Sequence, residues 1–396
     1  MAVVAKKGIY IVAAKRTPYG MYGGLLRDTL AEDLFATSAA AALKASGMAA
    51  DLVDTVNVGQ VMSVTQSGLS GRHAALKSGI PATRPVLTIN KLSGSGFAAI
   101  ICSAQEILIG SAKISLAGGM ESLSSVPFLV RGVRFGTQLR KAIQFEDHYQ
   151  KCLFDTYCKM YLIQTADMVA AKFGVTRRDA DEFAFRSYQK WKEADAEGVF
   201  NEELAPVAIK VKDRDVLMTR DELPLRDMTL EKLSSLSPTY KDGVSTSGNC
   251  CGNADGGGAV ILTDEESLKV HELKPLARLV GWSSVALDPV MLGIAPVLAV
   301  KSLLKRTGLT MNNMDLVELH ETFAAATVAC IRELDVDDDK LNVNGGAIAI
   351  GHPPAATGAR IVTNLTHELR RRGLKRALTA GSIAGGQSIA MIIEAV

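Results

Sequence analysis

The sequence has little of several features that mark specialised classes of protein. Its six cysteines have neither the paired spacing of a metal site nor the density of a disulfide framework, so we expect no metal site and a reducing, intracellular compartment. They are Cys102, Cys152, Cys158, Cys250, Cys251 and Cys330. Aromatic residues make up only 5% of the chain, whereas glycine is frequent with 35 residues, which is typical of α/β proteins with many tight turns.

The charge is balanced, and we expect neither a targeting signal nor a membrane-spanning segment. Lysine and arginine (44) nearly balance aspartate and glutamate (42), which predicts neither a nucleic-acid partner nor a membrane surface. No apolar run is long and uncharged enough to cross a bilayer, so we expect no integral membrane contact. The opening MAVVAKKG is too short for a secretory signal, and the final EAV is not a peroxisomal address. The 396 residues, 47% of them hydrophobic, predict at least two domains.

The stretch Thr88–Gly119 carries the clearest local pattern. The run Val86–Ile89 predicts the end of a buried strand, and Ile114–Ala117 predicts a second strand. Between them lie a glycine- and serine-rich elbow, Ser93–Gly96, and an apolar run with helical spacing that a glycine closes. The turn would place the Ser93 hydroxyl at a helix N-terminus, where free N–H groups and the dipole favour anionic chemistry.

The order of elements in the first third of the chain recurs in the last third. The first third predicts strands at Ile9–Ala14 and Asp51–Val58 and helices at Ala31–Lys44 and Arg72–Ser78. The last third predicts strands at Pro275–Trp282, Met314–Leu319 and Arg376–Ala380 and helices at Ala295–Arg306 and Ala355–Arg371. A second glycine-rich elbow, Gly345–Gly358, corresponds to Ser93–Gly96, which indicates a divergent duplication. Two alternating β/α copies predict two doubly wound layers whose elbows face one crevice.

The pattern loosens between the two halves, from about Ser124 to Tyr240. A helix over Arg177–Glu197 is heavily charged and is predicted to present a solvated face. We interpret the segment as an inserted lid or ligand-binding loop domain rather than a third sheet. It ends in the small-residue tract Gly243–Gly258, where the backbone can approach a ligand closely.

Reactive side chains lie at four predicted strand ends or elbows: Ser93, His320, His352 and Ser382. Each alone has an ordinary structural explanation, because serine is a common cap or turn residue and a single histidine is more often structural than catalytic. Glu321 would suit the start of a helix. The duplication brings all four ends to one crevice, so together they predict a site.

Four sequence blocks at these positions resemble the signature blocks of the thiolases. They are NKLSGSG from Asn90, HETFA from His320, GGAIAIGHP from Gly345 and SIAGGQ from Ser382, with support from AKRTP at Ala14, AGGMES at Ala117, Gly248-Asn249 and Asp255-Gly256. The resemblance is colinear over nearly the whole chain and is greatest to the mitochondrial type of 3-ketoacyl-CoA thiolase. It implies an α/β thiolase fold, with two duplicated βαβαβ halves packed as a five-layered αβαβα sandwich and an inserted loop domain.

The resemblance and the duplication together divide the chain into four segments. Residues 1–123 would form the first part of the N-terminal half, and residues 124–240 the inserted loop domain that holds coenzyme A. Residues 241–270 would return to the N-terminal half, and residues 271–396 would form the C-terminal half.

The thiolase resemblance implies roles for the four residues, and both positions where the family has a catalytic cysteine hold serine here. Ser93 corresponds to the nucleophilic cysteine and Ser382 to the second, acid/base cysteine. A thiol of pKa about 8.5 is partly ionised near neutrality, whereas a serine hydroxyl needs an adjacent base. His352 would be the base and oxyanion partner of Ser93. His320, where most thiolases have asparagine and some branches have histidine, would orient water or the thioester. We expect carbon–carbon thiolysis to be weakened or lost, with acyl transfer or hydrolysis favoured.

The resemblance also implies ligands and partners. Coenzyme A or acyl-CoA would be a substrate, with no permanently bound cofactor. Arg226 would lie near the nucleotide, although a surface arginine in a charged loop is the alternative, and Ser247 and Cys251 would lie along the pantetheine channel. A homodimer or homotetramer in the mitochondrion or the cytoplasm is implied, and the apolar strand Ile114–Ala117 is the predicted sheet edge for contact between copies.

Two functions stay open on the sequence. One is a thiolase-fold acyltransferase that works through Ser93. The other is a catalytically inactive thiolase-like protein that binds acyl-CoA or a protein partner without turnover. The presence of His320, Glu321 and His352 despite the loss of both thiols favours the enzyme.

Overall fold

A computed structural model describes the whole chain except residues 1, 6, 64–66, 213 and 226. One mixed sheet runs through both halves in the strand order β15-β16-β17-β14-β2-β13-β6-β4-β5, with β1 added to β14 and β3 to β13. The strands of the first half are β1 (Ala2–Val4), β2 (Ile9–Arg16), β3 (Gly20–Met21), β4 (Thr55–Gly59), β5 (Val86–Ile89), β6 (Ile114–Ser122) and β13 (Ala254–Asp264). Those of the second half are β14 (Ala277–Ala286), β15 (Leu316–Leu319), β16 (Arg376–Ile383) and β17 (Gln387–Ala395).

The two halves of the sheet have related pairing. In the first half β4 pairs in parallel with β5 and β6, and β13 lies antiparallel between β6 and β2. In the second half β15 pairs in parallel with β16, and β17 lies antiparallel between β16 and β14. The half-sheets join at a short seam, where Ile11 and Tyr10 of β2 pair with Ala277 and Arg278 of β14.

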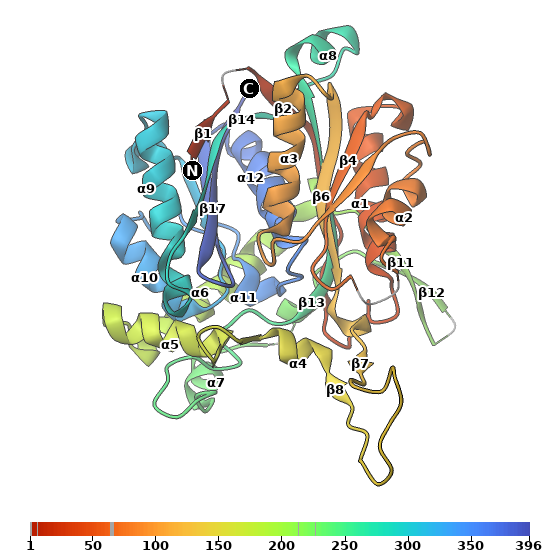
Figure 1. Ribbon diagram of the computed structural model, residues 1–396. Helices are drawn as coiled ribbons and strands as arrows, with labels where there is room; N and C mark the ends of the chain where they lie inside the picture. Colours follow the sequence, from red (N-terminus) through yellow and green to blue (C-terminus); the bar gives the residue numbers. More distant parts are fainter. Residues whose placement is uncertain (1, 6, 64–66, 213, 226) are drawn as a thin grey trace.

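Helices form three layers around the half-sheets, as Figure 1 shows. On one outer face lie α1 (Ala31–Ser46) and α2 (Ser70–Lys77), and on the other lie α9 (Ala295–Thr307) and α10 (Ala324–Leu334). Between the half-sheets, α3 (Ser95–Ile109) and α12 (Thr357–Arg372) contact each other. Helix α3 packs on strands of the first half, and α12 packs on strands of both halves. The five layers are the αβαβα sandwich that the thiolase resemblance implies.

The apolar run Leu92–Ile109 corrects one expectation from the sequence. Among the described residues it is long and apolar enough to cross a membrane by length and composition, so the statement that no such run exists was wrong. In the fold 61% of this run is buried, and Phe97, Ile100 and Ile107 belong to the central hydrophobic core. Burial between two half-sheets accounts for the apolar composition.

The sheet edge is a second correction. Strand β6, which contains the predicted edge Ile114–Ala117, lies between β13 and β4 and is buried along its whole length. The edge of the first half is β5, predicted as a buried strand end, where Leu87 is 48% exposed. An apolar strand composition predicts pairing and partial burial, but it does not tell which strand lacks a neighbour on one side.

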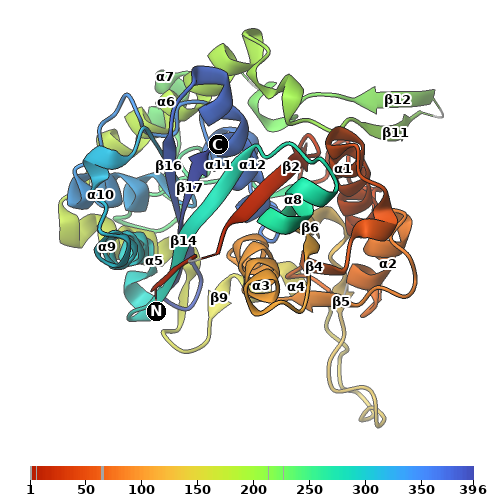
Figure 2. The ribbon, with the colours of Figure 1, turned by 90° about the horizontal axis from the view of Figure 1, so that it is seen from above.

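The segment between β6 and β13 holds helices and separate two-stranded sheets rather than a third large sheet. The helices are α4 (His148–Cys152), α5 (Leu162–Phe173), α6 (Arg177–Ala196) and α7 (Leu230–Ser235). The hairpins are β7 (Phe128–Leu129) with β8 (Glu146–Asp147), β9 (Phe154–Asp155) with β10 (Met160–Tyr161), and β11 (Val207–Val211) with β12 (Arg214–Met218). Figure 2 shows that two of these hairpins, β7/β8 and β11/β12, project from the body.

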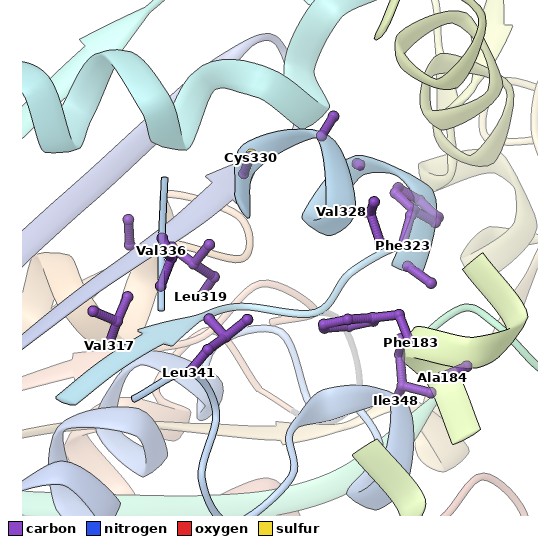
Figure 3. Packing of buried hydrophobic residues seen from close by; sticks show 14 of the residues in the cluster. Phe183, Ala184, Val317, Leu319, Phe323, Val328, Cys330, Val336, Leu341 and Ile348 are labelled. Carbon is purple, nitrogen blue, oxygen red and sulfur yellow. The ribbon is translucent and has the colours of Figure 1, made fainter. Parts of the chain in front are cut away.

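Helix α6 is less solvated than its charge suggests. Phe183, Tyr188 and Trp191 are buried on one face, which contacts α10 and the short α11 (Ala347–Ile350). Figure 3 shows Phe183 of α6 close to Ile348 of α11. The prediction of a solvated face therefore holds for one side of the helix only. The remaining helix, α8 (Glu265–Val270), follows β13.

A buried ion cluster ties the inserted segment to β2. The Arg16 guanidinium donates from Nε to Oε1 of Glu203 at 2.6 Å and from Nη1 to Oδ1 of Asp221 at 2.7 Å, and all three side chains are 1% exposed. Removing one partner of a buried ion pair leaves an uncompensated charge, which makes this cluster a strong structural constraint.

Candidate active site

Two glycines allow α3 and α12 to meet at their amino-terminal ends. A Cβ on Gly96 would lie 2.6 Å from the carbonyl oxygen of Ala355, and a Cβ on Gly358 would overlap the backbone nitrogen of Phe97. Such contacts are too short for any side chain, so both positions need glycine. The close approach sets the Ser93–Gly96 elbow against the elbow that carries His352.

Ser93 and His352 are the first two members of a hydrogen-bonded chain. The Nε2 atom of His352 lies 3.1 Å from Oγ of Ser93, and its Nδ1 atom lies 2.7 Å from Oγ1 of Thr357. The Thr357 hydroxyl in turn donates to the carbonyl oxygen of Pro353 at 3.1 Å. Because a hydroxyl has a single hydrogen, Thr357 accepts from Nδ1–H, and Nε2 keeps the lone pair that accepts from the Ser93 hydroxyl. The geometry therefore suits general-base activation of Ser93.

His352 and His320 form a pair of buried neutral imidazoles. Their ring centroids are 4.3 Å apart, and the two side chains are 8% and 6% exposed. Burial and the Arg360 charge lower the pKa of His352 to about 3. Burial, with smaller contributions from His352 and Arg360, holds the pKa of His320 well below its usual value. Both rings are uncharged at neutral pH, so His352 is placed as a base but is a weak one.

The His320 ring has unused hydrogen-bonding capacity. Within the described part of the chain, neither of its buried ring nitrogens has a hydrogen-bond partner. Its backbone N–H donates to the Ala380 carbonyl at 2.9 Å, which fixes the start of the loop that follows β15. Buried polar atoms without partners are rare in folded proteins. A water molecule or a substrate oxygen would satisfy this ring.

Glu321 is a buried carboxylate and not the start of a helix, because α10 begins at Ala324. Its oxygens accept from the Ser187 hydroxyl at 2.7 Å, the Asn342 amide at 2.7 Å and the Ile348 N–H at 3.1 Å. The carboxylate thus ties the loop after β15, in which it lies, to α6, to the segment before α11 and to α11 itself.

Ser382 lies on a neighbouring segment at the end of β16. Its Oγ is 3.2 Å from Oγ1 of Thr322. A cavity of about 10 Å³ is lined by Ser382, Thr322, His320 and Cys330, which is space for about one water molecule. A Cβ on Gly94 would collide with the side chain of Ile383, so the Ser382 segment packs directly on the Ser93 elbow. All four predicted residues therefore surround one region.

The residues predicted to hold coenzyme A are less closely grouped. Ser247 lines an open cavity of about 270 Å³ together with Tyr22 and Met228. The backbone N–H of Cys251 donates to the Thr322 carbonyl at 3.0 Å, which places it beside the His320 loop. Arg226 lies outside the described residues. In the part of the chain that the structure describes, no group of three or more His, Cys, Asp or Glu side chains is arranged to hold a metal ion.

Sequence reasoning missed two residues of the site. Thr357 is the first residue of α12, five residues after His352, and its hydroxyl contacts the His352 ring. This spacing of a hydroxyl from the histidine in the elbow could have indicated the contact. Asn253 pairs with His352 through a β-bridge, while its side-chain oxygen accepts a hydrogen bond from the Tyr149 hydroxyl. No local pattern in the sequence marks Asn253.

Comparisons with known proteins match nearly the whole chain to thiolases. Two family models match, "Thiolase, N-terminal domain" over residues 9–266 and "Thiolase, C-terminal domain" over residues 273–395. The mitochondrial 3-ketoacyl-CoA thiolase of Homo sapiens is 46% identical, and a probable acetyl-CoA acyltransferase of Staphylococcus aureus is 38% identical, each covering 98% of both chains. The crystal structure of human mitochondrial 3-ketoacyl-CoA thiolase in complex with CoA has a TM-score of 0.96 and 45% identity, over 100% of this chain and 99% of that one.

Proposed function

Since this chain belongs to the thiolase family and is a thiolase-like acyl-CoA acyltransferase, we propose that Ser93 is its nucleophile and accepts the acyl group. The substrates are acyl-CoA and 3-ketoacyl-CoA thioesters, and the products arise by acyl transfer or hydrolysis more than by carbon–carbon cleavage. The observation that carries the proposal is the 3.1 Å contact between Oγ of Ser93 and Nε2 of His352.

The reaction proceeds in two steps. Nε2 of His352 takes the Ser93 proton as Oγ attacks the thioester carbonyl, and the resulting imidazolium returns that proton to the departing coenzyme A thiolate. The acyl group is then an ester on Ser93. A water molecule or an acceptor thiol attacks this ester, loses its proton to His352, and releases Ser93 with its hydroxyl restored. His320 orients the water or the thioester oxygen.

His352 limits the rate of this chemistry. A pKa of about 3 lies about 3.5 units below that of an ordinary histidine, which makes the imidazole less basic by about 5 kcal/mol. In the described surroundings of the ring, Nδ1–H meets the neutral Thr357 hydroxyl rather than a carboxylate that would stabilise the imidazolium. We therefore expect slow turnover, with a neutral base across the physiological pH range.

Thiolysis needs a second group that gains and loses a proton near neutral pH, and Ser382 does not supply one. Among the described residues, the one hydrogen-bond partner of the Ser382 hydroxyl is another hydroxyl, that of Thr322. Neither alcohol ionises near pH 7, so abstraction of a proton α to a thioester lacks its acid/base. This supports weakened or lost carbon–carbon cleavage.

Coenzyme A is the substrate, and no permanently bound cofactor is needed. We propose that Ser247 and Cys251 border the pantetheine and that Arg226 lies near the nucleotide. The four-segment division at residues 123, 240 and 270 stays a prediction, and so do the mitochondrial or cytoplasmic location and the roles of the four site residues. We also propose a homodimer or homotetramer, and the open edge of β5, with Leu87 exposed, supports it better than β6 does.

The second candidate function is a thiolase-like protein that binds acyl-CoA or a protein partner without turnover. The two serines and the weak base favour it over a full thiolase. One experiment separates the candidates: incubation with acyl-CoA alone, and separately with 3-ketoacyl-CoA plus coenzyme A, with Ser93→Ala as the control. Free thiol released from acyl-CoA by the wild type and not by the variant supports acyl transfer to Ser93. Coenzyme A binding without any product supports the inactive protein.

A further inference from the structure

Glu121 is a buried carboxyl group that the proposed reaction does not use. It lies near the end of β6, a strand that packs against α3 and α12, the two helices that follow the elbows. Figure 1 shows β6 running beside α3. The residue is 0% exposed. Burying a carboxyl group is costly unless its oxygens are hydrogen-bonded, so the partners of Glu121 indicate what it does in the fold.

The partners of Glu121 are three backbone N–H groups from two loops. Its Oε1 atom accepts from Met62 at 3.0 Å, and its Oε2 atom accepts from Val61 at 3.2 Å. The Oε2 atom also accepts from Ala355 at 3.4 Å, which lies three residues after His352 in the second elbow. One carboxyl group therefore joins the loop after β4 to the elbow that carries His352.

The loop after β4 is in turn bonded to the first elbow. The Val61 carbonyl accepts from Nδ2 of Asn90 at 3.3 Å, and Oδ1 of Asn90 accepts from the Leu92 N–H at 3.0 Å. Leu92 directly precedes Ser93 and has a φ of 51°. A residue with a Cβ is unfavourable in this left-handed conformation, so its neighbours must hold it there. The chain of hydrogen bonds from Glu121 thus reaches the residue next to Ser93.

Strand β6 also packs directly on the backbone of the second elbow. A Cβ on Gly119, which faces the same side of β6 as Glu121, would overlap the carbonyl oxygen of Ala355. The strand therefore contacts Ala355 at its carbonyl through Gly119 and at its N–H through Glu121. Since Oγ of Ser93 and Nε2 of His352 are 3.1 Å apart, a shift of one elbow relative to the other would break their hydrogen bond.

We propose that Glu121 is a positioning residue for acyl transfer, whose carboxyl group holds the two elbows so that Ser93 and His352 stay in hydrogen-bond contact. The inference rests on the proposed function, because it assigns to Glu121 the geometry which that function needs. The hydrogen bonds of Glu121 go to backbone N–H groups, so it acts on Ser93 and His352 through the loops that carry them.

The variant Glu121→Gln tests the inference in the full-length protein. Glutamine has nearly the same shape but a single acceptor oxygen, and its amide N–H groups would face backbone N–H groups that need an acceptor. We expect the single-turnover rate of acyl transfer to fall at least fivefold, the effect of leaving one buried N–H unsatisfied. The affinity for coenzyme A, measured by calorimetry, should stay within twofold of the wild type, because Glu121 holds the loops of the reacting groups.

The ¹⁵N shift of Nε2 in His352 gives a readout that needs no turnover. The shift reports whether Nε2 accepts from the Ser93 hydroxyl, and Ser93→Ala provides the value without this bond. In Glu121→Gln the shift should move towards the Ser93→Ala value. A wild-type protein that shows the bond but transfers no acyl group would refute the proposed function, whereas the effect of Glu121→Gln on the shift would still decide this inference.

The matched control is Asp255→Asn, which changes another buried carboxyl group beside β6. Asp255 lies on the neighbouring strand β13 and accepts from the N–H and the hydroxyl of Ser124 rather than from either elbow. Asp255→Asn should keep the wild-type rate and the wild-type His352 shift.

A second variant, Asn90→Ser, interrupts the chain at an exposed position. Serine can still accept from the Leu92 N–H but is too short to reach Val61. Acyl transfer should become about 2- to 5-fold slower, as expected for the loss of one exposed hydrogen bond.

The inference is overturned if Glu121→Gln keeps both the wild-type rate and the wild-type Nε2 shift, or if Asp255→Asn changes both as much as Glu121→Gln does. If Glu121→Gln does not fold, Asn90→Ser decides alone, and an unchanged rate and shift in that variant would overturn the inference.

Discussion

Replacing Thr357 with valine tests the hydrogen-bonded chain that prepares His352. Valine matches threonine in shape but removes the only hydroxyl that accepts from Nδ1–H in the described surroundings of the ring. An unsatisfied buried donor costs about 1–3 kcal/mol, and the ring avoids this cost by moving its proton to Nε2. Nε2 would then donate to Ser93 rather than accept from it, and the base would be lost.

We expect Thr357→Val to lower the rate of acyl transfer about 5- to 150-fold, which is the same 1–3 kcal/mol expressed as a rate. Coenzyme A release in a single turnover measures this rate, and the KM for acyl-CoA should change little because Thr357 acts through His352. Thr357→Ser keeps the hydroxyl and should stay within a few-fold of the wild type. The ¹⁵N shifts of the His352 ring report the tautomer even where turnover is too slow to follow.

The reasoning fails if Thr357→Val transfers acyl groups at the wild-type rate, or if its His352 ring keeps the proton on Nδ1. Loss of activity in both variants would instead indicate disruption of the start of α12. Denaturant unfolding distinguishes this case, because Thr357→Val should lose about 1–2 kcal/mol of stability and Thr357→Ser less.

Three further predictions address the acid/base chemistry and the frame of the site. The double variant Ser93→Cys with Ser382→Cys restores both thiols and should cleave 3-ketoacyl-CoA faster than either single variant in a product assay. If the double variant is no faster than the single variants, the surrounding loops block cleavage. Because the low pKa keeps His352 neutral above about pH 3, acyl transfer should change less than twofold from pH 8 to 5.5, where a base of pKa 6.5 would lose about tenfold; a pH–rate profile with a midpoint near 6.5 would refute this. Arg16→Met should reduce the free energy of unfolding by about 3–5 kcal/mol, because the carboxylates of Glu203 and Asp221 would stay buried without their cation. A loss below about 1 kcal/mol in denaturant titrations would contradict the buried cluster.

Much of the fold follows from periodic patterns and their terminators. Helix α3 ends as predicted at Gly110, which adopts the left-handed conformation of a helix C-cap at φ 78°. The repeated order of strands and helices gave two related half-sheets, and the two elbows meet because the duplicated helices α3 and α12 pack at their amino-terminal ends. These features depend on local sequence and on topology rules, which a sequence displays.

The features that the sequence analysis missed or predicted wrongly depend on residues that are far apart in the sequence. Whether β5 or β6 forms the sheet edge is decided by where β13 inserts, more than 130 residues later in the chain. The buried face of α6 arises because α10 and α11 cover it. The contact between Thr357 and His352 requires a particular turn between them, and the burial of Glu321 requires three partners from separate segments. Composition carries none of this information.

The central claim is that Ser93 receives an acyl group from coenzyme A with the help of His352. Its most direct test is to incubate the protein with acyl-CoA, quench with acid and locate the acyl group by mass spectrometry of peptides. We predict an ester on the peptide that contains Ser93, absent in Ser93→Ala and strongly reduced in His352→Ala. An unmodified Ser93 peptide while free coenzyme A accumulates, or an acyl group on a cysteine such as Cys251, would contradict the account.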